Sequence, residues 1–293
     1  MPLRMPFPLL LLLLSAPAWA KDEGVLDPQG PIAAAERTIL FDSVGIMLAI
    51  VVPVIIATLA AAWWFRASNH RAVHLPDWEY SGRIELVVWS IPAMTILLLG
   101  GLGWVSAHDL DPPKPLGRQK PLEIDVVSLD WKWLFIYPEQ GIASAGRLVL
   151  PAGQPVDFRI TSSGVMNSFF IPQIGSQIYA MAGMVTRLNL QADAPGSYAG
   201  LSAQFSGNGF SDMRFAADVM PADRFGQWVD QTRQESPARL DQAAYADLAK
   251  PGVLARPVLF GGVEPDLFDH ALHAAIRGDM AHPSHPPLNK ESE

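Results

Sequence analysis

Two long stretches of this sequence contain no charged residue, and they constrain the fold more than any other feature. The first runs from Ser43 to Phe65, and the second runs from Leu86 to Ala107. Because a helix rises about 1.5 Å per residue, each stretch can cross the roughly 30 Å hydrocarbon core of a bilayer. We therefore predict two transmembrane helices, at about 43–65 and 86–107, joined as an antiparallel hairpin by a short polar loop.

The N-terminus has the pattern of a secretory signal. Arg4 supplies the positive charge, Leu9 to Leu14 form a short apolar core, and Ala18-Trp-Ala20 is a small-x-small cleavage site. We assign residues 1–20 to a signal peptide and 21–107 to an N-terminal segment with the hairpin. An uncleaved anchor is the alternative. In both cases the two later crossings place the C-terminal domain outside the cytoplasm.

After the hairpin, the pattern changes between residues 121 and 220. Apolar side chains occupy every second position near the end of this region, at Met213, Phe215, Ala217 and Val219. Turn signals such as Pro151-Ala-Gly153 separate the apolar runs. Several short strands of this kind predict an antiparallel β-sandwich.

A helical pattern follows the predicted sandwich. One face collects Phe225, Trp228 and Val229, and helical spacing continues through Leu240, Ala244 and Leu248. We predict a C-terminal helical extension over residues 221–278. The polar, proline-containing tail at 279–293 is expected to be disordered.

Composition excludes several classes of function. The sequence contains no cysteine, which excludes disulfides, thiolate metal sites and a cysteine nucleophile. The net charge of −8 argues against nucleic acid as a partner. The hydrophobic content of 49% with 17% charged residues is typical of a partly membrane-embedded chain.

Residues 200–213 outline a metal-binding loop that lacks the usual ligands. A copper loop in an oxidase electron-entry domain has the pattern Cys-x3-Cys-x3-His-x2-Met, with a Glu between the cysteines and a His upstream. The corresponding positions here hold Asn167, Ser202, Gln204, Ser206, Phe210 and Met213. Hydroxyl, amide and phenyl groups are poor copper ligands, and a lone thioether is a weak one. We predict that this chain holds no metal or other cofactor.

This loop is one of five stretches that resemble subunit II of the haem-copper terminal oxidases, in the quinol branch that includes cytochrome bo-type ubiquinol oxidase. The other four are Ile84–Pro92, Ser128–Pro138, Gly175–Met184 and Val263–Asp269. The order and spacing of these stretches make the resemblance specific. It implies that the sandwich is a cupredoxin-like domain.

The resemblance also implies a function. The complex would oxidise ubiquinol, reduce oxygen to water and pump protons across a bacterial inner (cytoplasmic) membrane, with the sandwich in the periplasm. Catalysis would lie in the principal partner, subunit I, which in the family holds haem b, haem o or haem a, and one copper. Subunits III and IV, membrane lipid, and ubiquinol reached through subunit I are further implied partners. This chain would have a structural and assembly role and no catalytic residue.

Glu85 is the residue to which the resemblance gives a role in proton movement. In the family, the Glu at this position lies near the entrance of one proton-uptake pathway into subunit I. Ionisable groups at the start of a membrane span are often functional. The alternative is a carboxylate that only stabilises the N-terminus of its helix.

Other candidate residues have simpler interpretations. Trp131 and Trp133 occupy positions where copper-bearing relatives receive electrons, but without copper we expect them to serve packing. The methionines of the sandwich are predicted to be core residues, because residues 121–220 contain no His or Cys to join them at a metal. A membrane-anchored cupredoxin-like scaffold outside any oxidase is the alternative function.

Overall fold

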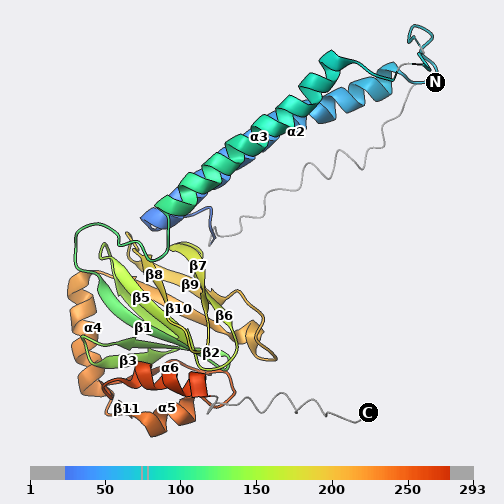
Figure 1. Ribbon diagram of the computed structural model, residues 1–293. Coiled ribbons are helices and arrows are strands. Elements are labelled where there is room, and N and C mark those ends of the chain that lie inside the picture. Colours follow the sequence, from blue (N-terminus) through green and yellow to red (C-terminus); the bar gives the residue numbers. More distant parts are fainter. Residues whose placement is uncertain (1–23, 74, 78, 278–293) are drawn as a thin grey trace, which may run out of the picture.

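The computed structural model describes residues 24–73, 75–77 and 79–277 (Figure 1). The predicted signal peptide and the predicted disordered tail lie outside these residues.

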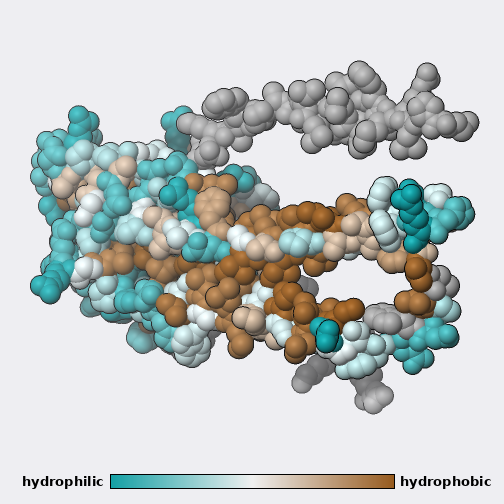
Figure 2. Space-filling model, turned by 90° about the horizontal axis from the view of Figure 1, so that it is seen from above, coloured by the Kyte–Doolittle hydropathy of each residue, from teal (hydrophilic) through white to brown (hydrophobic). Residues whose placement is uncertain are grey.

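The hairpin consists of two long helices, α2 (Pro31–Trp64) and α3 (Gly82–Asp109), which run side by side away from the β-domain (Figure 1). Both are long and apolar enough to cross a membrane. Apolar residues cover the hairpin, whereas the β-domain is largely hydrophilic outside (Figure 2). The first helix starts at Pro31 rather than at the predicted Ser43, because proline favours the first turn and the added turns pack against the β-domain.

The β-domain is a sandwich of two sheets with strand orders β12-β3-β2-β1-β5-β8 and β4-β10-β9-β6-β7. The strands of the first sheet are β12 (Val258–Phe260), β3 (Ile142–Ala145), β2 (Lys132–Tyr137), β1 (Leu122–Leu129), β5 (Val156–Ser162) and β8 (Thr186–Leu190). Those of the second are β4 (Arg147–Pro151), β10 (Arg214–Met220), β9 (Gly196–Ser202), β6 (Asn167–Ile171) and β7 (Gly175–Ala180).

The predicted β-sandwich is confirmed, but the expectation that its strands are antiparallel was wrong for two strand pairs. Strand β1 pairs with β5 in parallel, from Leu122 opposite Val156 to Ser128 opposite Ser162. Strands β10 and β4 are also parallel neighbours. Parallel partners are joined through a long connection, here one that crosses to the other sheet, and the short turn signals in the sequence do not report such pairings.

Aromatic side chains fill the space between the sheets. The rings of Phe169 and Phe215 stack with centroids 5.4 Å apart, and Trp133 meets both rings edge-on. Trp133 is 1% exposed, so the predicted packing role is confirmed for this residue. The alternation predicted for β10 is also confirmed, since Phe215, Ala217 and Val219 are buried and Arg214 is exposed.

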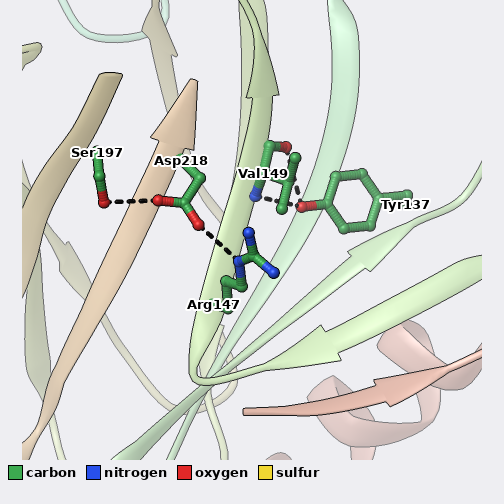
Figure 3. Close-up of polar contacts among 5 residues, drawn as sticks. All are labelled: Tyr137, Arg147, Val149, Ser197 and Asp218. Atoms are coloured by element: carbon green, nitrogen blue, oxygen red, sulfur yellow. Dashed lines mark hydrogen bonds and ion pairs between the residues drawn. The ribbon is translucent and has the colours of Figure 1, made fainter. Parts of the chain in front are cut away.

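Polar side chains tie neighbouring strands together at the edge of the second sheet (Figure 3). The buried Tyr137 hydroxyl donates to the carbonyl of Val149 (3.0 Å) and accepts from its backbone amide (2.8 Å). Beside it, Asp218 accepts hydrogen bonds from Arg147 and Ser197, each at 2.6 Å. A single tyrosine thereby satisfies both backbone groups of a residue in the opposite sheet.

The C-terminal extension has two parts. Helix α4 (Ala222–Glu235) packs Phe225 and Val229 against the core between the two sheets. The remaining elements, β11 (Arg239–Leu240), α5 (Gln242–Leu248), β13 (Gly262–Val263) and α6 (Leu267–Arg277), form a third layer on the outer face of the first sheet. A second core packs Leu240, Tyr245, Phe260 and Phe268 against side chains of β1, β2 and β3. Strands β1, β2 and β3 are therefore buried on both faces, and their buried residues do not alternate strictly.

The predicted C-terminal helices are present, but three short strands, β11, β12 and β13, interrupt them. Leu240, placed on a helix by its spacing from Ala244 and Leu248, lies in β11 and pairs with Val263. Residues 258–260 form β12, which joins the edge of the first sheet next to β3. The i, i+4 spacing of Leu240 and Ala244 does not indicate a shared helix here, because β11 ends at Leu240 just before α5 begins.

The segment before α2 is bonded to the β-domain. The Gln29 amide donates to the Gln173 carbonyl (2.6 Å), and the Gln29 carbonyl accepts from the Asp193 amide (2.8 Å). The start of α2 and the β-domain therefore lie on the same side of the hairpin. The loop that joins α2 to α3 lies at the opposite end (Figure 1).

Candidate functional site

The loop that outlines a copper site connects β9 to β10. It begins at Ser202, passes through a 3₁₀ turn, η1 (Phe210–Asp212), and ends at Met213. The Ser202 amide donates to the Met213 carbonyl at 3.1 Å and closes the base of the loop. The antiparallel pairing of β9 with β10 thus brings the two ends of the loop together.

Four of the six positions predicted to correspond to copper ligands form two contacting pairs. The buried Ser202 hydroxyl lies 3.0 Å from Asn167 Oδ1 and 3.3 Å from the Gln204 carbonyl oxygen, both acceptors. The Ser206 hydroxyl faces the Met213 sulfur at 3.9 Å. Asn167 also donates to the Val165 carbonyl at 3.2 Å. The polar groups at the base of the loop therefore satisfy one another without a metal.

The other two positions do not contribute side chains to this cluster. Phe210 packs edge-on against Phe205, with ring centroids 5.6 Å apart. At Gln204 the contact is made by the backbone carbonyl. Phe210 stands at the position predicted to correspond to a copper-ligating histidine. Its phenyl ring offers no lone pair to a metal, and its contact with Phe205 is apolar.

The donor set does not fit a dinuclear copper centre. Thiolates and imidazoles are the ligands that such a centre uses, and the sequence contains no cysteine and no histidine between residues 121 and 220. Within the described residues, no group of three or more His, Cys, Asp or Glu is placed to hold a metal ion. Met213 is 1% exposed and is packed as a core residue.

Trp131 supports the loop in a way that sequence reasoning missed. It lies in the tight turn between β1 and β2 with φ of 62°, a conformation that is costly for a bulky residue. Its Nε1–H donates to the Ser206 carbonyl at 3.0 Å. A side chain at Gly209 would collide with the Trp131 ring. The contact therefore requires both a strained tryptophan and a glycine opposite it.

The methionines of the β-domain differ from the prediction. Met213 is buried as expected, but Met166 is 41% exposed and Met184 is 54% exposed. Tyr179 and Phe205 are also exposed, at 46% and 70%. These four residues lie on or next to β6 and β7 and in the β9–β10 loop. Large exposed apolar side chains of this kind are typical of interaction surfaces.

Glu85 lies at the other end of the molecule, in the first turn of α3. Its Oε2 accepts a hydrogen bond from Trp89 Nε1 at 2.9 Å. Both side chains line a shallow hollow of about 450 Å³, together with Tyr80 and Ser90. The spacing of Glu85 from Trp89 could have indicated this contact, since residues four apart on a helix are neighbours.

Comparison with known proteins agrees with this geometry. Residues 123–220 match the family model of the cytochrome c oxidase subunit II periplasmic domain, and residues 234–276 match the COX aromatic rich motif. The sequence is 46% identical to cytochrome bo(3) ubiquinol oxidase subunit 2 of Pseudomonas aeruginosa, over 98% of this chain and 89% of that one.

Other relatives carry related names. Ubiquinol oxidase subunit 2 of Acetobacter aceti is 48% identical over 84% of this chain and 80% of its own length. Quinol oxidase subunit 2 of Bacillus cereus is 36% identical over 84% of this chain and 85% of its own length. With two membrane helices, the sandwich and the C-terminal helices in place, this chain belongs to the subunit 2 family of the ubiquinol oxidases.

Proposed function

We propose that this chain is the copper-free structural subunit of a proton-pumping quinol oxidase in a bacterial inner membrane. Catalysis belongs to subunit I, where ubiquinol is oxidised and oxygen is reduced to water. Subunit I carries haem b, haem o or haem a, and one copper. The β-domain faces the periplasm, and subunits III and IV complete the complex.

The closed hydrogen-bond cluster at Ser202 and Asn167 carries this proposal. The loop keeps its shape through groups that do not bind copper, so the chain offers no electron relay. A quinol dissolves in the bilayer and reaches subunit I directly. A copper relay from a soluble cytochrome is therefore not required.

Metal and haem analysis of the purified complex tests the absence of a relay. We expect one copper for each pair of haems, all of it in subunit I. Three coppers for each pair of haems would contradict the proposal, because the excess would have to occupy the β9–β10 loop.

Two surfaces support docking to subunit I. Between α2 and α3 the hairpin carries an apolar groove of about 650 Å³, lined in part by Ile50, Met94 and Leu98. The second surface is the exposed apolar group of Met166, Tyr179, Met184 and Phe205 described above. We propose that the hairpin packs beside subunit I in the lipid and that the β-domain covers its outer face.

We further propose that Glu85 serves proton uptake from the cytoplasm into subunit I. The carboxylate lies in the first turn of α3, at the end of the hairpin away from the β-domain, and borders an open hollow. A titratable group in this place can accept a proton from water and pass it deeper into the membrane.

Glu85→Ala in the assembled complex tests this role. We expect oxidase turnover and proton pumping to fall, with the haem content unchanged. Glu79→Ala is the matched control, because Glu79 is an exposed carboxylate in the loop at the same end of the hairpin. Equal rates in Glu85→Ala and the unmodified complex would contradict a role in proton uptake.

A further inference from the structure

The first turns of α3 present two competing partners to the Glu85 carboxylate. One partner is the N-terminus of the helix, where the amides of Gly82, Arg83 and Ile84 precede the first intrahelical bond, which runs from the Glu85 amide to the Ser81 carbonyl. The helix dipole also draws a carboxylate toward this end. Ser81 supplies no side-chain cap. Without another partner, the Glu85 carboxylate is expected to hydrogen-bond to these amides.

The other partner is the indole of Trp89, one turn further along α3. Side chains on a helix lean toward its N-terminus, so the Trp89 ring lies over the turn that carries Glu85. Its Nε1–H donates to Glu85 Oε2 at 2.9 Å, a distance typical of a charge-assisted hydrogen bond. In the structure, the carboxylate is therefore held along the helix, on the side that leads into the membrane.

The surroundings of this pair suit a group that exchanges protons. Glu85, Trp89 and Ser90 line the same open hollow beside α3. The Tyr80 hydroxyl lies near Gly82, so that a side chain at Gly82 would touch it at 3.1 Å. The Tyr80 ring thus borders the hollow at the start of α3, and the Trp89 ring borders it further along the helix. The Glu85 carboxylate lies between these two residues along the chain.

We propose that Trp89 is a positioning residue for proton uptake: its Nε1–H holds the Glu85 carboxylate turned into the membrane and away from the amides of the first turn. The inference rests on the role proposed above for Glu85. In each cycle the carboxylate takes one proton from cytoplasmic water and releases one proton toward subunit I. Trp89 does not exchange a proton itself.

The test compares Trp89→Phe with Trp104→Phe in the assembled complex. Phenylalanine keeps an aromatic ring and removes the N–H donor. Trp104 is an exposed tryptophan of the same helix whose ring contacts His108, so its variant controls for the loss of an indole in the span. We expect turnover to fall roughly three- to tenfold in Trp89→Phe, as for the loss of one hydrogen bond of ordinary net strength. Trp104→Phe should retain its rate.

Two further readouts separate positioning from packing. Trp89→Phe should shift the infrared carboxylate band that Glu85→Gln removes, and it should move the pH dependence of turnover. In the Glu85→Gln background, Trp89→Phe should cause no additional loss. If Trp89→Phe does not assemble, Trp89→Leu and Trp89→His replace it, and the histidine variant, which keeps a ring N–H, should be the faster of the two.

The outcomes distinguish the two proposals. Unchanged turnover in Glu85→Gln would overturn the role of Glu85, and the inference with it. Reduced turnover in Glu85→Gln with equal rates for Trp89→Phe and Trp104→Phe would overturn only the inference. A loss in Trp89→Phe that persists in the Glu85→Gln background would also overturn it, because Trp89 would then act through packing. Equal rates for Trp89→Leu and Trp89→His would count against it in the same way.

Discussion

Asn167 and Ser202, two of the positions predicted to correspond to copper ligands, form a hydrogen-bonded pair at the base of the loop. Both residues are buried, and each satisfies the other through a hydrogen bond of 3.0 Å. A buried hydroxyl or amide without a partner would cost about 1–3 kcal/mol. This matched polar pair therefore stabilises the base of the loop without requiring an ion.

The protonation of Asp125 is coupled to the free energy of unfolding, because the pKa of its carboxyl differs between the folded and unfolded states. Burial raises the pKa of its carboxyl to about 6, although the Arg159 guanidinium, 3.3 Å away, lowers it. The nearby carboxylates Asp269, Glu123 and Asp157 raise it further. The folded protein thus binds this proton more tightly than the unfolded chain, where the pKa is near 3.8.

The sign of the pH effect follows from this raised pKa. The stabilising contribution is complete below the unfolded pKa near 3.8 and is lost as the pH rises through about 6. We expect the β-domain of the detergent-solubilised chain to unfold at lower denaturant concentration at pH 7.5 than at pH 4.5. The contribution of Asp125 is at most about 3 kcal/mol.

Asp125→Asn should remove this part of the pH dependence. Denaturant titrations at several pH values provide the measurement, and Asp223→Asn, an exposed carboxylate at the start of α4, is the control. A slope between pH 4 and 7 that is the same in the Asp125 variant and the control would refute the assignment.

At the scale of elements, the C-terminal layer is attached to the sandwich by a lysine. Lys132 extends from the start of β2, and its ammonium donates to the carbonyls of Leu248 (2.9 Å) and Lys250 (2.7 Å). These carbonyls lie at the C-terminal end of α5, where a helix leaves acceptors unsatisfied and favours positive charge. The contact joins residues more than a hundred positions apart in the chain.

Lys132→Met should loosen α5 while leaving the sandwich folded. We expect the amides of α5 to exchange with deuterium faster, corresponding to a local loss of about 1–2 kcal/mol. Lys120→Met is the matched control, because Lys120 is exposed and pairs with Glu139 at the surface. Protection of α5 that matches the control would show that the lysine does not hold this helix.

At the scale of the whole molecule, the segment before α2 is bonded to the sandwich, and this contact sets the position of the hairpin. Gly30 lies where a side chain would collide with the Gln191 carbonyl. The backbone bonds of Gln29 to Gln173 and Asp193 flank this close approach. The start of α2 is therefore fixed to the β-domain, and a bond from the Asn189 amide to the Pro112 carbonyl (2.8 Å) joins the segment after α3 to the same domain.

Gly30→Ala should release the start of α2 from the β-domain. Because the sequence has no cysteine, spin labels can be placed cleanly at Leu26→Cys and Lys120→Cys. We expect the distance distribution between them to broaden in Gly30→Ala. Gly24→Ala is the control, since a side chain there meets nothing within 4 Å. A distribution as narrow as that of the control would contradict this account.

Features that depend on local composition were predictable from the chain alone. The uncharged runs determine the two membrane helices, because a bilayer selects for apolar length and little else. The missing copper donors determine the chemistry of the β9–β10 loop, because no fold can supply a thiolate to a sequence without cysteine. The alternation in β10 was also predictable from local composition, because one face of this strand is buried and the other is exposed.

Features that depend on distant partners required the tertiary structure. Parallel pairing of β1 with β5, the strand at Leu240 and the third layer over the first sheet all arise from contacts between segments far apart in the chain. The exposure of Met166 and Met184 and the positive φ of Trp131 likewise depend on which segments of the fold pack near these residues. Local sequence limits which element a segment can form, but the free energy of burial is gained only when a particular partner covers it.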